Sequence, residues 1–190
     1  MNQRCSWVGT DPVMMAYHDT EWGVPLRDDR KLFEFMVLDA FQAGLSWRIV
    51  LHKRAGMRAA FVNFEPEKIA QFNEVVVEQL LANDQIIRNR QKITATINNA
   101  RLFTQLQQQS GSFSNYLWAY VSDRPILNHW QQDEQIPSRT QLSDTISQDL
   151  QAGGFKFVGS TIVYAWLQAA GLVNDHLATC FRYRQLAAQA

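Results

Sequence analysis

Hydrophobic side chains recur at helical spacing along most of the chain. Two stretches show this most fully: Leu32, Phe33, Phe35, Met36, Leu38 and Ala40 in the first, and Ile93, Ile97, Ala100, Leu102, Phe103 and Leu106 in the second. Spacings of three and four residues put such side chains on one face of a helix. No alternating pattern of useful length indicates a strand. The pattern therefore predicts an all-α fold.

Capping residues indicate where several helices begin. Asp11 followed by Pro12 predicts a short helix that runs through His18. Further helices are predicted from a cap at Asp28 or Asp29 to near Gly44, from a cap at Ser46, from Pro66, and over 75–82, 88–108, 113–121, 143–150 and 160–170. A polar loop is expected at 107–112 and an irregular surface connection at 124–141. Neither repeats nor a linker divide the sequence, so residues 1–190 are expected to form one domain.

The segment 143–170 predicts a hairpin of two helices, with Gly159 at the turn into the second. A glycine there lets the backbone approach a large partner, and the free N–H groups at the helix start favour an anion. A phosphate of DNA would fit this turn. A glycine at such a place can also simply begin a helix, so the residues alone leave both interpretations open.

Cysteine and histidine offer a candidate metal site. His176 and Cys180 are four residues apart, so on a helix they would share one face and could bind one ion. Cys5 and His18 complete a Cys2His2 set. Zinc binds such ligands in a tetrahedron, and four protein ligands leave no open position, so we expect a structural Zn2+ that joins the first helix to the last. Simple packing, or a disulfide between the two cysteines, is the alternative; a reducing compartment favours the metal.

Composition narrows the class of protein. Hydrophobic residues make up 46% of the 190 residues, as in a folded globule, and no run is long enough to span a membrane. The first residues lack the apolar core of a signal peptide, which predicts a cytoplasmic protein without a membrane partner. Eighteen basic and eighteen acidic residues cancel. Acids are absent from 40–64 and 85–122, however, and this segregation can produce either a positive face or ordinary solvated helices.

Two longer motifs carry a family resemblance. The segments FKFVGSTIVYAWLQAAGLVNDH and QAGLSW resemble the 3-methyladenine DNA glycosylase I family of helix–hairpin–helix DNA glycosylases, and the resemblance extends from Arg4 to Cys180. It implies the helix–hairpin–helix glycosylase fold, with zinc joining the N- and C-terminal segments through the same four ligands. It also implies an enzyme that flips out and hydrolytically releases 3-methyladenine from alkylated double-stranded DNA. We expect a monomer.

The resemblance assigns the chemistry to Tyr17, Asp39 and Trp47. A flipped base needs aromatic faces to stack on and a polar group to read its edge. The base would be sandwiched between rings, and the carboxylate would favour a positively charged base. Each residue taken singly could equally be part of the core, although an unpaired buried carboxylate is costly. The expected base- and DNA-binding residues are Trp7, Trp22, Gln42, Gly44, Leu45, Lys156, Gly159, Ser160 and Thr161.

Leu45 is a candidate wedge for the gap that the extruded nucleotide leaves; a leucine buried at a helix start is the alternative. Asn174 stands where many glycosylases of this superfamily carry a catalytic Asp. Thr161 stands where those that also cut the strand carry a Lys. Both departures imply simple base release without strand cleavage.

One departure from the family affects the pocket itself. Asp39-Ala40 replaces the usual Glu-Gly, which leaves the substrate preference open. The chain could therefore be a glycosylase for another alkylated or deaminated base. It could also be a non-catalytic, zinc-stabilised protein that binds damaged DNA, or a purely structural helical module. The last alternative predicts no salt-dependent DNA binding.

Overall fold

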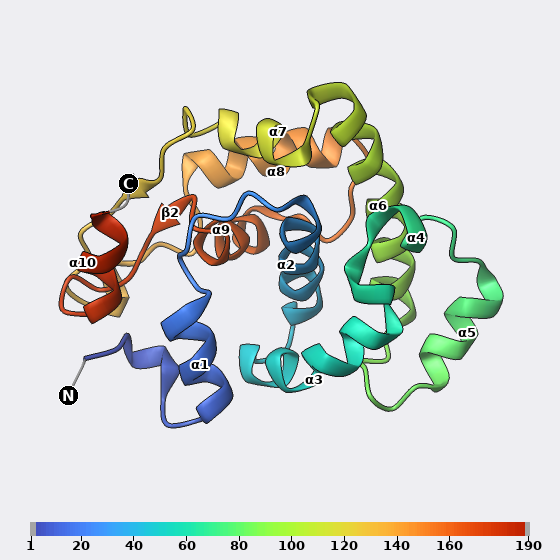
Figure 1. Cartoon of the computed structure of the whole chain (residues 1–190), viewed down its shortest axis with the longest axis horizontal. Helices are drawn as coiled ribbons and strands as arrows, with labels where there is room; N and C mark the ends of the chain where they lie inside the picture. Colours follow the sequence, from blue (N-terminus) through green and yellow to red (C-terminus); the bar gives the residue numbers. More distant parts are fainter. Residues whose placement is uncertain (1–2, 189–190) are drawn as a thin grey trace.

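Helices α2 (Asp29–Gln42) and α9 (Ser160–Ala169) lie side by side in the middle of the molecule (Figure 1). The computed structural model describes residues 3–188. Every residue of α2 from Leu32 to Phe41 is buried, because other helices surround it on all sides. The central position of α2 puts the polar side chain of Asp39 inside the protein.

Helix α8 (Gln141–Ala152) packs on α9, so the two form the predicted hairpin. Helices α6 (Arg90–Ser110) and α7 (Phe113–Ala119) lie next to this hairpin (Figure 1). Between α2 and α6 the chain forms α3 (Trp47–Ala60), η2 (Val62–Phe64), α4 (Pro66–Ile69) and α5 (Glu74–Ala82). The fold is thus mostly helical, as the hydrophobic pattern predicts.

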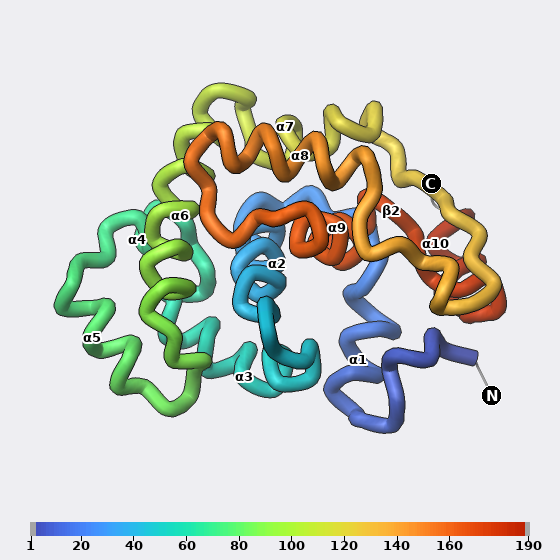
Figure 2. The backbone as a smooth tube through the Cα atoms, turned by 180° about the vertical axis from the view of Figure 1, so that it is seen from behind, coloured from blue at the N-terminus to red at the C-terminus, as the bar shows by residue number. Residues whose placement is uncertain are grey.

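The two ends of the chain meet on one side of the molecule. Figure 2 shows α1 (Pro12–Thr20) and the preceding turn η1 (Ser6–Val8) beside β2 (Val173–Asn174) and α10 (Phe181–Ala187). Strand β2 pairs in parallel with β1 (Ile126–Leu127), and Ile126 lies opposite Val173. The irregular connection around 124–141, which also contains η3 (Asp133–Gln135), is thereby tied to the C-terminal segment.

The helix starts predicted from Asp11, from Asp28 and from Ser46 are confirmed by side-chain caps. Asp11 accepts from the backbone N–H groups of Val13 and Met14, Asp28 caps α2, and Ser46 caps α3. The polar loop at 107–112 is wrong, because α6 continues through Ser110. Glutamine is a good helix former, and the helix ends only at Gly111, whose φ is +78°.

The helical spacing proposed for His176 and Cys180 is also wrong. Residues 175–180 form turns, and Cys180 is the N-cap of α10. Helix α8 begins two residues earlier than predicted, because Thr140 and Ser143 form a reciprocal capping box.

One continuous cluster of buried side chains forms the core. The rings of Phe33, Phe103 and Phe113 are central to it, with Phe103 and Phe113 stacked at a centroid distance of 3.9 Å. Among residues 3–188, no helix combines the length and the apolar character that crossing a bilayer requires.

Most cations of the acid-free segments contact acids or backbone carbonyl oxygens of the protein, and several of them remain exposed. Arg54 is buried and donates to Glu21 and Glu34, and Arg58 also donates to Glu34. Lys92 Nζ donates instead to backbone carbonyl oxygens at the C-terminal end of α2, at 2.8 Å and 2.6 Å. The positive charges of Arg54 and Lys92 are thus inside the protein, whereas Arg48, Arg58 and Arg90 remain at its surface.

Candidate functional site

A cavity of about 270 Å³ opens between the N-terminal segment and the α2–α9 pair. Ligand sites usually measure roughly 300–1,000 Å³, so this one suits a single small ring system. The structure brings six of the predicted residues together here. The full lining is Trp7, Tyr17, Trp22, Asp39, Gln42, Trp47, Ile136, Ala165, Gln168 and Ala169.

Aromatic rings form much of the cavity wall. The centroids of Tyr17 and Trp47 are 5.3 Å apart, and those of Trp7 and Trp22 are 5.0 Å apart. A base between two parallel rings needs two van der Waals contacts, roughly 7 Å in all. The sequence suggested a base sandwiched between rings. Tyr17 and Trp47 are too close together to hold a base between them. They form one continuous wall against which a flat ring can stack.

Asp39 is the acidic residue of this lining, and its carboxyl group is unusual. The residue is only 4% exposed, and Oδ2 has no hydrogen-bond partner among the described residues. Burial raises the pKa of Asp39 well above its usual range, because removal from water disfavours the charged form. An unsatisfied buried oxygen destabilises a fold, so its presence in a cavity wall points to a ligand.

A second, smaller cavity of about 220 Å³ adjoins the first on the side of the hairpin. Asp39, Gln42 and Ala165 line both cavities, so they form the partition between them. Leu45 and Thr161 line only the second cavity. Leu45 is 37% exposed, so the alternative of a buried leucine at the helix start is wrong.

The turn into α9 lies next to this second cavity. Gly159 has an ordinary φ of −62°, and a Cβ added there would have no neighbour within 4 Å. Neither backbone conformation nor crowding within the protein requires a glycine. Ser160 Oγ lies 2.9 Å from Ser143 Oγ and so links the two arms of the hairpin.

Besides Gly159 and Ser160, two more predicted DNA-binding residues line neither cavity. Gly44 takes a positive φ of +77° in the turn after α2 and so places Leu45. Lys156 is exposed beside Phe157 in a separate groove, and its backbone N–H and carbonyl are both bonded to Asn99 at 2.8 Å. The structure therefore gives Lys156 a place on the hairpin surface and no contact with the aromatic cavity.

Four cavity residues were missed in the sequence: Ile136, Ala165, Gln168 and Ala169. Ile136 comes from the irregular connection, whose path could not be predicted. Gln168 did carry a signal, because it is a polar residue in the apolar helix STIVYAWLQAA.

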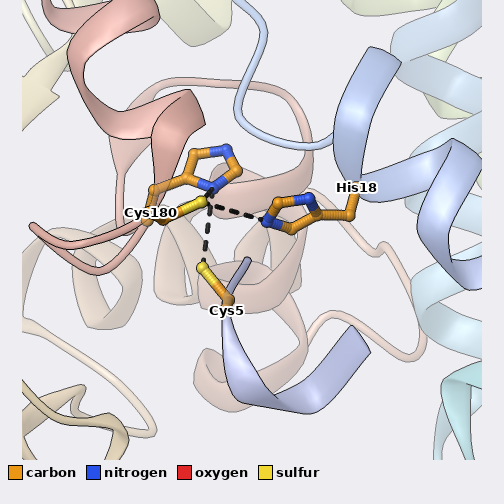
Figure 3. A group of neighbouring side chains, drawn as sticks. Cys5, His18 and Cys180 are labelled. Atoms are coloured by element: carbon orange, nitrogen blue, oxygen red, sulfur yellow. Dashed lines mark hydrogen bonds between the residues drawn. The ribbon is translucent and has the colours of Figure 1, made fainter. Parts of the chain in front are cut away.

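Cys5, His18, His176 and Cys180 form a buried cluster on the side where the chain ends meet. Their ligand atoms all lie within 4.8 Å of one another. Figure 3 shows Cys5, His18 and Cys180 pointing toward a common centre from three different segments. Cys180 Sγ is 3.4 Å from His18 Nε2, and His176 Nδ1 is 3.6 Å from each sulfur. The four residues could therefore hold one metal ion, as predicted, although turns rather than a helix bring the last two together.

Both imidazoles of this cluster are oriented by outer contacts. His18 Nδ1 lies 2.8 Å from Asp19 Oδ1, and His176 Nε2 lies 3.1 Å from the carbonyl oxygen of Trp22. Each ring thus presents its other nitrogen to the sulfurs, which is the usual arrangement around a bound metal. Hydrogen bonds from Cys5, His176 and His18 lower the pKa of Cys180, which favours the thiolate that a metal needs.

The acidic turn after α9 does not itself line the cavity. Asn174 accepts from the backbone N–H of His176 and donates to the carbonyl of Tyr183. Asp175 is fully buried and accepts hydrogen bonds from four side chains. Neither residue lines the cavity, so Asp39 is the acid in contact with it among the described residues.

Comparisons with known proteins agree with this arrangement. A sequence model of the methyladenine glycosylase family matches residues 7–183. DNA-3-methyladenine glycosylase 1 of Escherichia coli (strain K12) is 47% identical over 181 residues, which cover 95% of this chain and 97% of that protein. A crystal structure of 3-methyladenine DNA glycosylase I superposes with a TM-score of 0.92 at 49% identity, covering 94% of this chain and 98% of that one.

A structure that describes 3-methyladenine recognition by 3-methyladenine DNA glycosylase I from Staphylococcus aureus superposes with a TM-score of 0.91. It is 36% identical and covers 94% of this chain and 95% of that one. The resemblance noted in the sequence is thus confirmed over nearly the whole length. The chain belongs to the methyladenine glycosylase family.

Proposed function

We propose that this protein is a DNA repair glycosylase that releases 3-methyladenine from alkylated DNA. The observation that carries this is the base-sized aromatic cavity with the unpartnered Asp39 carboxyl in its wall. Relatives that match almost the entire chain bear that activity in their names. We also propose that residues 1–190 act as one glycosylase domain of the helix–hairpin–helix superfamily, which the single core and the α8–α9 hairpin support.

Asp39 suits a positively charged base. In the empty cavity its raised pKa favours the neutral acid, since nothing nearby compensates a negative charge. An alkylated adenine that carries positive charge would supply that compensation and favour the carboxylate. An uncharged normal base would not, so Asp39 provides a reason to prefer the lesion. Tyr17, Trp47 and the other rings supply stacking, which is worth about 1–3 kcal/mol per base.

The position of Asp39 between the two cavities bears on catalysis. When the glycosidic bond breaks, the base leaves neutral and positive charge develops on the sugar. Only contacts that strengthen in the transition state accelerate the reaction. A base in the first cavity would place its sugar toward the second, so Asp39 would remain close to the charge as it moves. The released neutral base loses this attraction and can leave.

The hairpin would hold the DNA backbone. Helix α9 begins at Ser160 with free N–H groups, and Gly159 leaves open space in front of them. A phosphate could approach this turn closely, with Thr161 and Leu45 facing the extruded nucleotide. Neither cavity has a lysine in its lining, which fits base release by water without strand cleavage.

We infer that the Cys2His2 cluster binds structural zinc. Zinc bonds of about 2.3 Å to sulfur and about 2.0–2.1 Å to nitrogen, set tetrahedrally, put those two ligand atoms roughly 3.6 Å apart. The sulfur–nitrogen distances of 3.4–3.6 Å in the cluster match this value. The ion would tie Cys5 and His18 near the start of the chain to the C-terminal turn, and it would take no part in the chemistry.

The decisive experiment is to incubate the protein with methylated duplex DNA and identify the liberated base by chromatography. We expect free 3-methyladenine, with strands that break only after alkali opens the abasic sites. Asp39→Asn is the matched control and should release far less. Tight binding of the lesion without any free base would instead identify a non-catalytic protein that binds damaged DNA. Release of a different base alone would overturn the substrate.

A further inference from the structure

Gln168 lines the aromatic cavity, and one end of its side-chain amide is bonded to Asp175. Its Nε2 lies 2.8 Å from Asp175 Oδ2. A carboxylate only accepts hydrogen bonds, so the NH2 end of the amide must face Asp175. The carbonyl oxygen Oε1 is then the end left for the cavity that Gln168 lines. No residue within 3–188 donates to Oε1.

Asp175 holds this amide in one orientation. It is 0% exposed and accepts four hydrogen bonds. At Oδ1 the donors are Asn128 Nδ2 at 2.7 Å and Trp130 Nε1 at 2.8 Å. At Oδ2 they are the Tyr164 hydroxyl at 2.5 Å and Gln168. Tyr164 and Gln168 are one turn apart on α9, so rigid neighbours fix the carboxylate and the carboxylate fixes the amide.

A fixed hydrogen-bond acceptor distinguishes bases by their donor groups, which the charge-sensitive Asp39 does not do. The carboxyl of Asp39 responds to positive charge, which adenine and guanine nucleosides both carry when methylated at N3. At C6, adenine has an amine that donates and guanine has a carbonyl that accepts, whereas the amine of guanine is at C2. An acceptor in the cavity wall would therefore favour the amine and leave a carbonyl opposed to another oxygen.

We propose that Gln168 Oε1 accepts a hydrogen bond from the C6 amine of a flipped adenine lesion, and that Asp175 acts as the positioning residue for it. Gln168 thus selects adenine over guanine lesions, while Asp39 selects charge. This inference rests on the proposed glycosylase function and deepens it.

The test compares the release of 3-methyladenine and 3-methylguanine from methylated duplexes under single-turnover conditions. Gln168→Met keeps the length of the side chain but removes its acceptor. We expect the rate for 3-methyladenine to fall about tenfold, in line with one lost hydrogen bond. The rate for 3-methylguanine should stay the same or rise, so the ratio of the two rates falls. Equal losses for both bases, or no change, would overturn the proposal.

Asp175→Asn tests the orientation of the amide. The Trp130 indole can only donate, so the oxygen of the new side chain must stay on its side, and the NH2 group must take the place of Oδ2. The Gln168 amide would then turn over and present its NH2 group to the cavity. The preference should shift toward 3-methylguanine. An unchanged preference in a folded Asp175→Asn variant would contradict the assigned role of Asp175.

Tyr164→Phe is the matched control, because Asp175 still accepts from Asn128, Trp130 and Gln168 when the Tyr164 hydroxyl is removed, and Tyr164 does not line the cavity. The ratio of the two rates should equal that of the wild type. A shift as large as that of Gln168→Met would mean that general loosening of α9 causes the effect. If the wild type releases neither base, the proposed function fails; if it releases 3-methyladenine but Gln168→Met keeps the ratio, only this inference fails.

Discussion

At the scale of single residues, Asp39 combines a structural cost with a chemical use. Its Oδ2 is buried without a partner, and its neighbours on α2 are apolar core residues. A side chain chosen for stability alone would be hydrophobic at this position. The conflict between burial and charge is therefore the feature of α2 that most directly indicates a ligand.

Asp39→Asn should make the protein more stable and less active. The pKa of Asp39 is raised by burial, so the folded protein binds this proton more tightly than the unfolded chain does. The stability that the proton contributes is present in acid and is lost as the pH rises toward the folded pKa. Asparagine has no such proton. We expect a gain in Tm of about 3 °C or more at about pH 9 that shrinks at about pH 4, near the unfolded pKa of the carboxyl group, with base release strongly reduced.

Asp11→Asn is a control in which the change in Tm should have the opposite sign. A hydrogen bond from His52 lowers the pKa of Asp11 to about 2, so its stabilisation is present at neutral pH and is lost in acid. Asparagine can still cap α1 but cannot form the ion pair with Arg48. This variant should lower the Tm at neutral pH. A Tm for Asp39→Asn that is equal to or below that of the wild type at about pH 9 would contradict the unpaired state of Asp39.

At the scale of elements, a substitution in the turn into α9 should change DNA binding without changing stability. Gly159→Ala should leave the Tm unchanged or slightly higher, because the backbone there suits alanine and no atom lies within 4 Å of the added Cβ. Binding to a lesion-containing duplex should weaken about tenfold if a phosphate lies against this turn. Tm and duplex affinity are measured on the same preparation. Unchanged affinity would rule out the turn as the phosphate site.

Gly171 provides the contrast at the other end of α9. Its φ is +71°, and an added Cβ would lie 2.4 Å from the backbone carbon of Val24. Here the protein itself requires glycine, so Gly171→Ala should unfold or strongly destabilise the chain. The two glycines of one helix thus carry opposite predictions.

Two adjacent aspartates at the start of α2 differ in the hydrogen bonds that they accept. Asp28 accepts one bond, from the backbone N–H of Lys31. Asp29 accepts from the backbone N–H groups of Phe113 and Ser114 and from Gln107, and so connects α2 to α7. Asp28→Ala should cost about 1 kcal/mol of unfolding free energy. Asp29→Ala should cost more, about 2–3 kcal/mol, because three donors lose their acceptor. Denaturant unfolding measures both, and equal costs would contradict this reading.

At the scale of the whole molecule, the metal cluster joins segments that are far apart in sequence. Cys5 and His18 come from the N-terminal part and Cys180 from the end of the C-terminal turn (Figure 3). The same region of the chain holds Trp7 and Tyr17 against the cavity. Loss of the metal should therefore loosen one wall of the base site, although no ligand contacts the base cavity directly.

If the Cys2His2 cluster holds zinc as proposed, Cys180→Ser should prevent zinc binding and lower the Tm by several degrees, because the metal no longer joins the two ends of the chain. Elemental analysis and thermal unfolding are the measurements. His129→Gln is the matched control, since His129 lies outside the cluster and contacts Tyr183 near the surface. A Cys180→Ser protein with a full complement of zinc would contradict the ligand set.

The sequence by itself determined much of the fold, because helix formation depends on local signals. Apolar spacing defined the core helices, and the side chains of Asp11 and Ser46 marked where two of them begin. The motifs QAGLSW and FKFVGSTIVYAWLQAAGLVNDH were long and specific enough to identify the family. The family resemblance also pointed to Tyr17, Asp39 and Trp47, which do line one cavity.

Only the tertiary structure decided which charges are free and which side chains meet. Arg54 and Lys92 look available for DNA in the sequence but are committed to partners distant along the chain. Ile136 and Gln168 reach the cavity because the fold brings a connection and a helix face to it. These hydrogen bonds and this burial depend on residues that are far apart in the sequence, so no local pattern encodes them. For that reason the unpartnered oxygen of Asp39 became visible only in three dimensions.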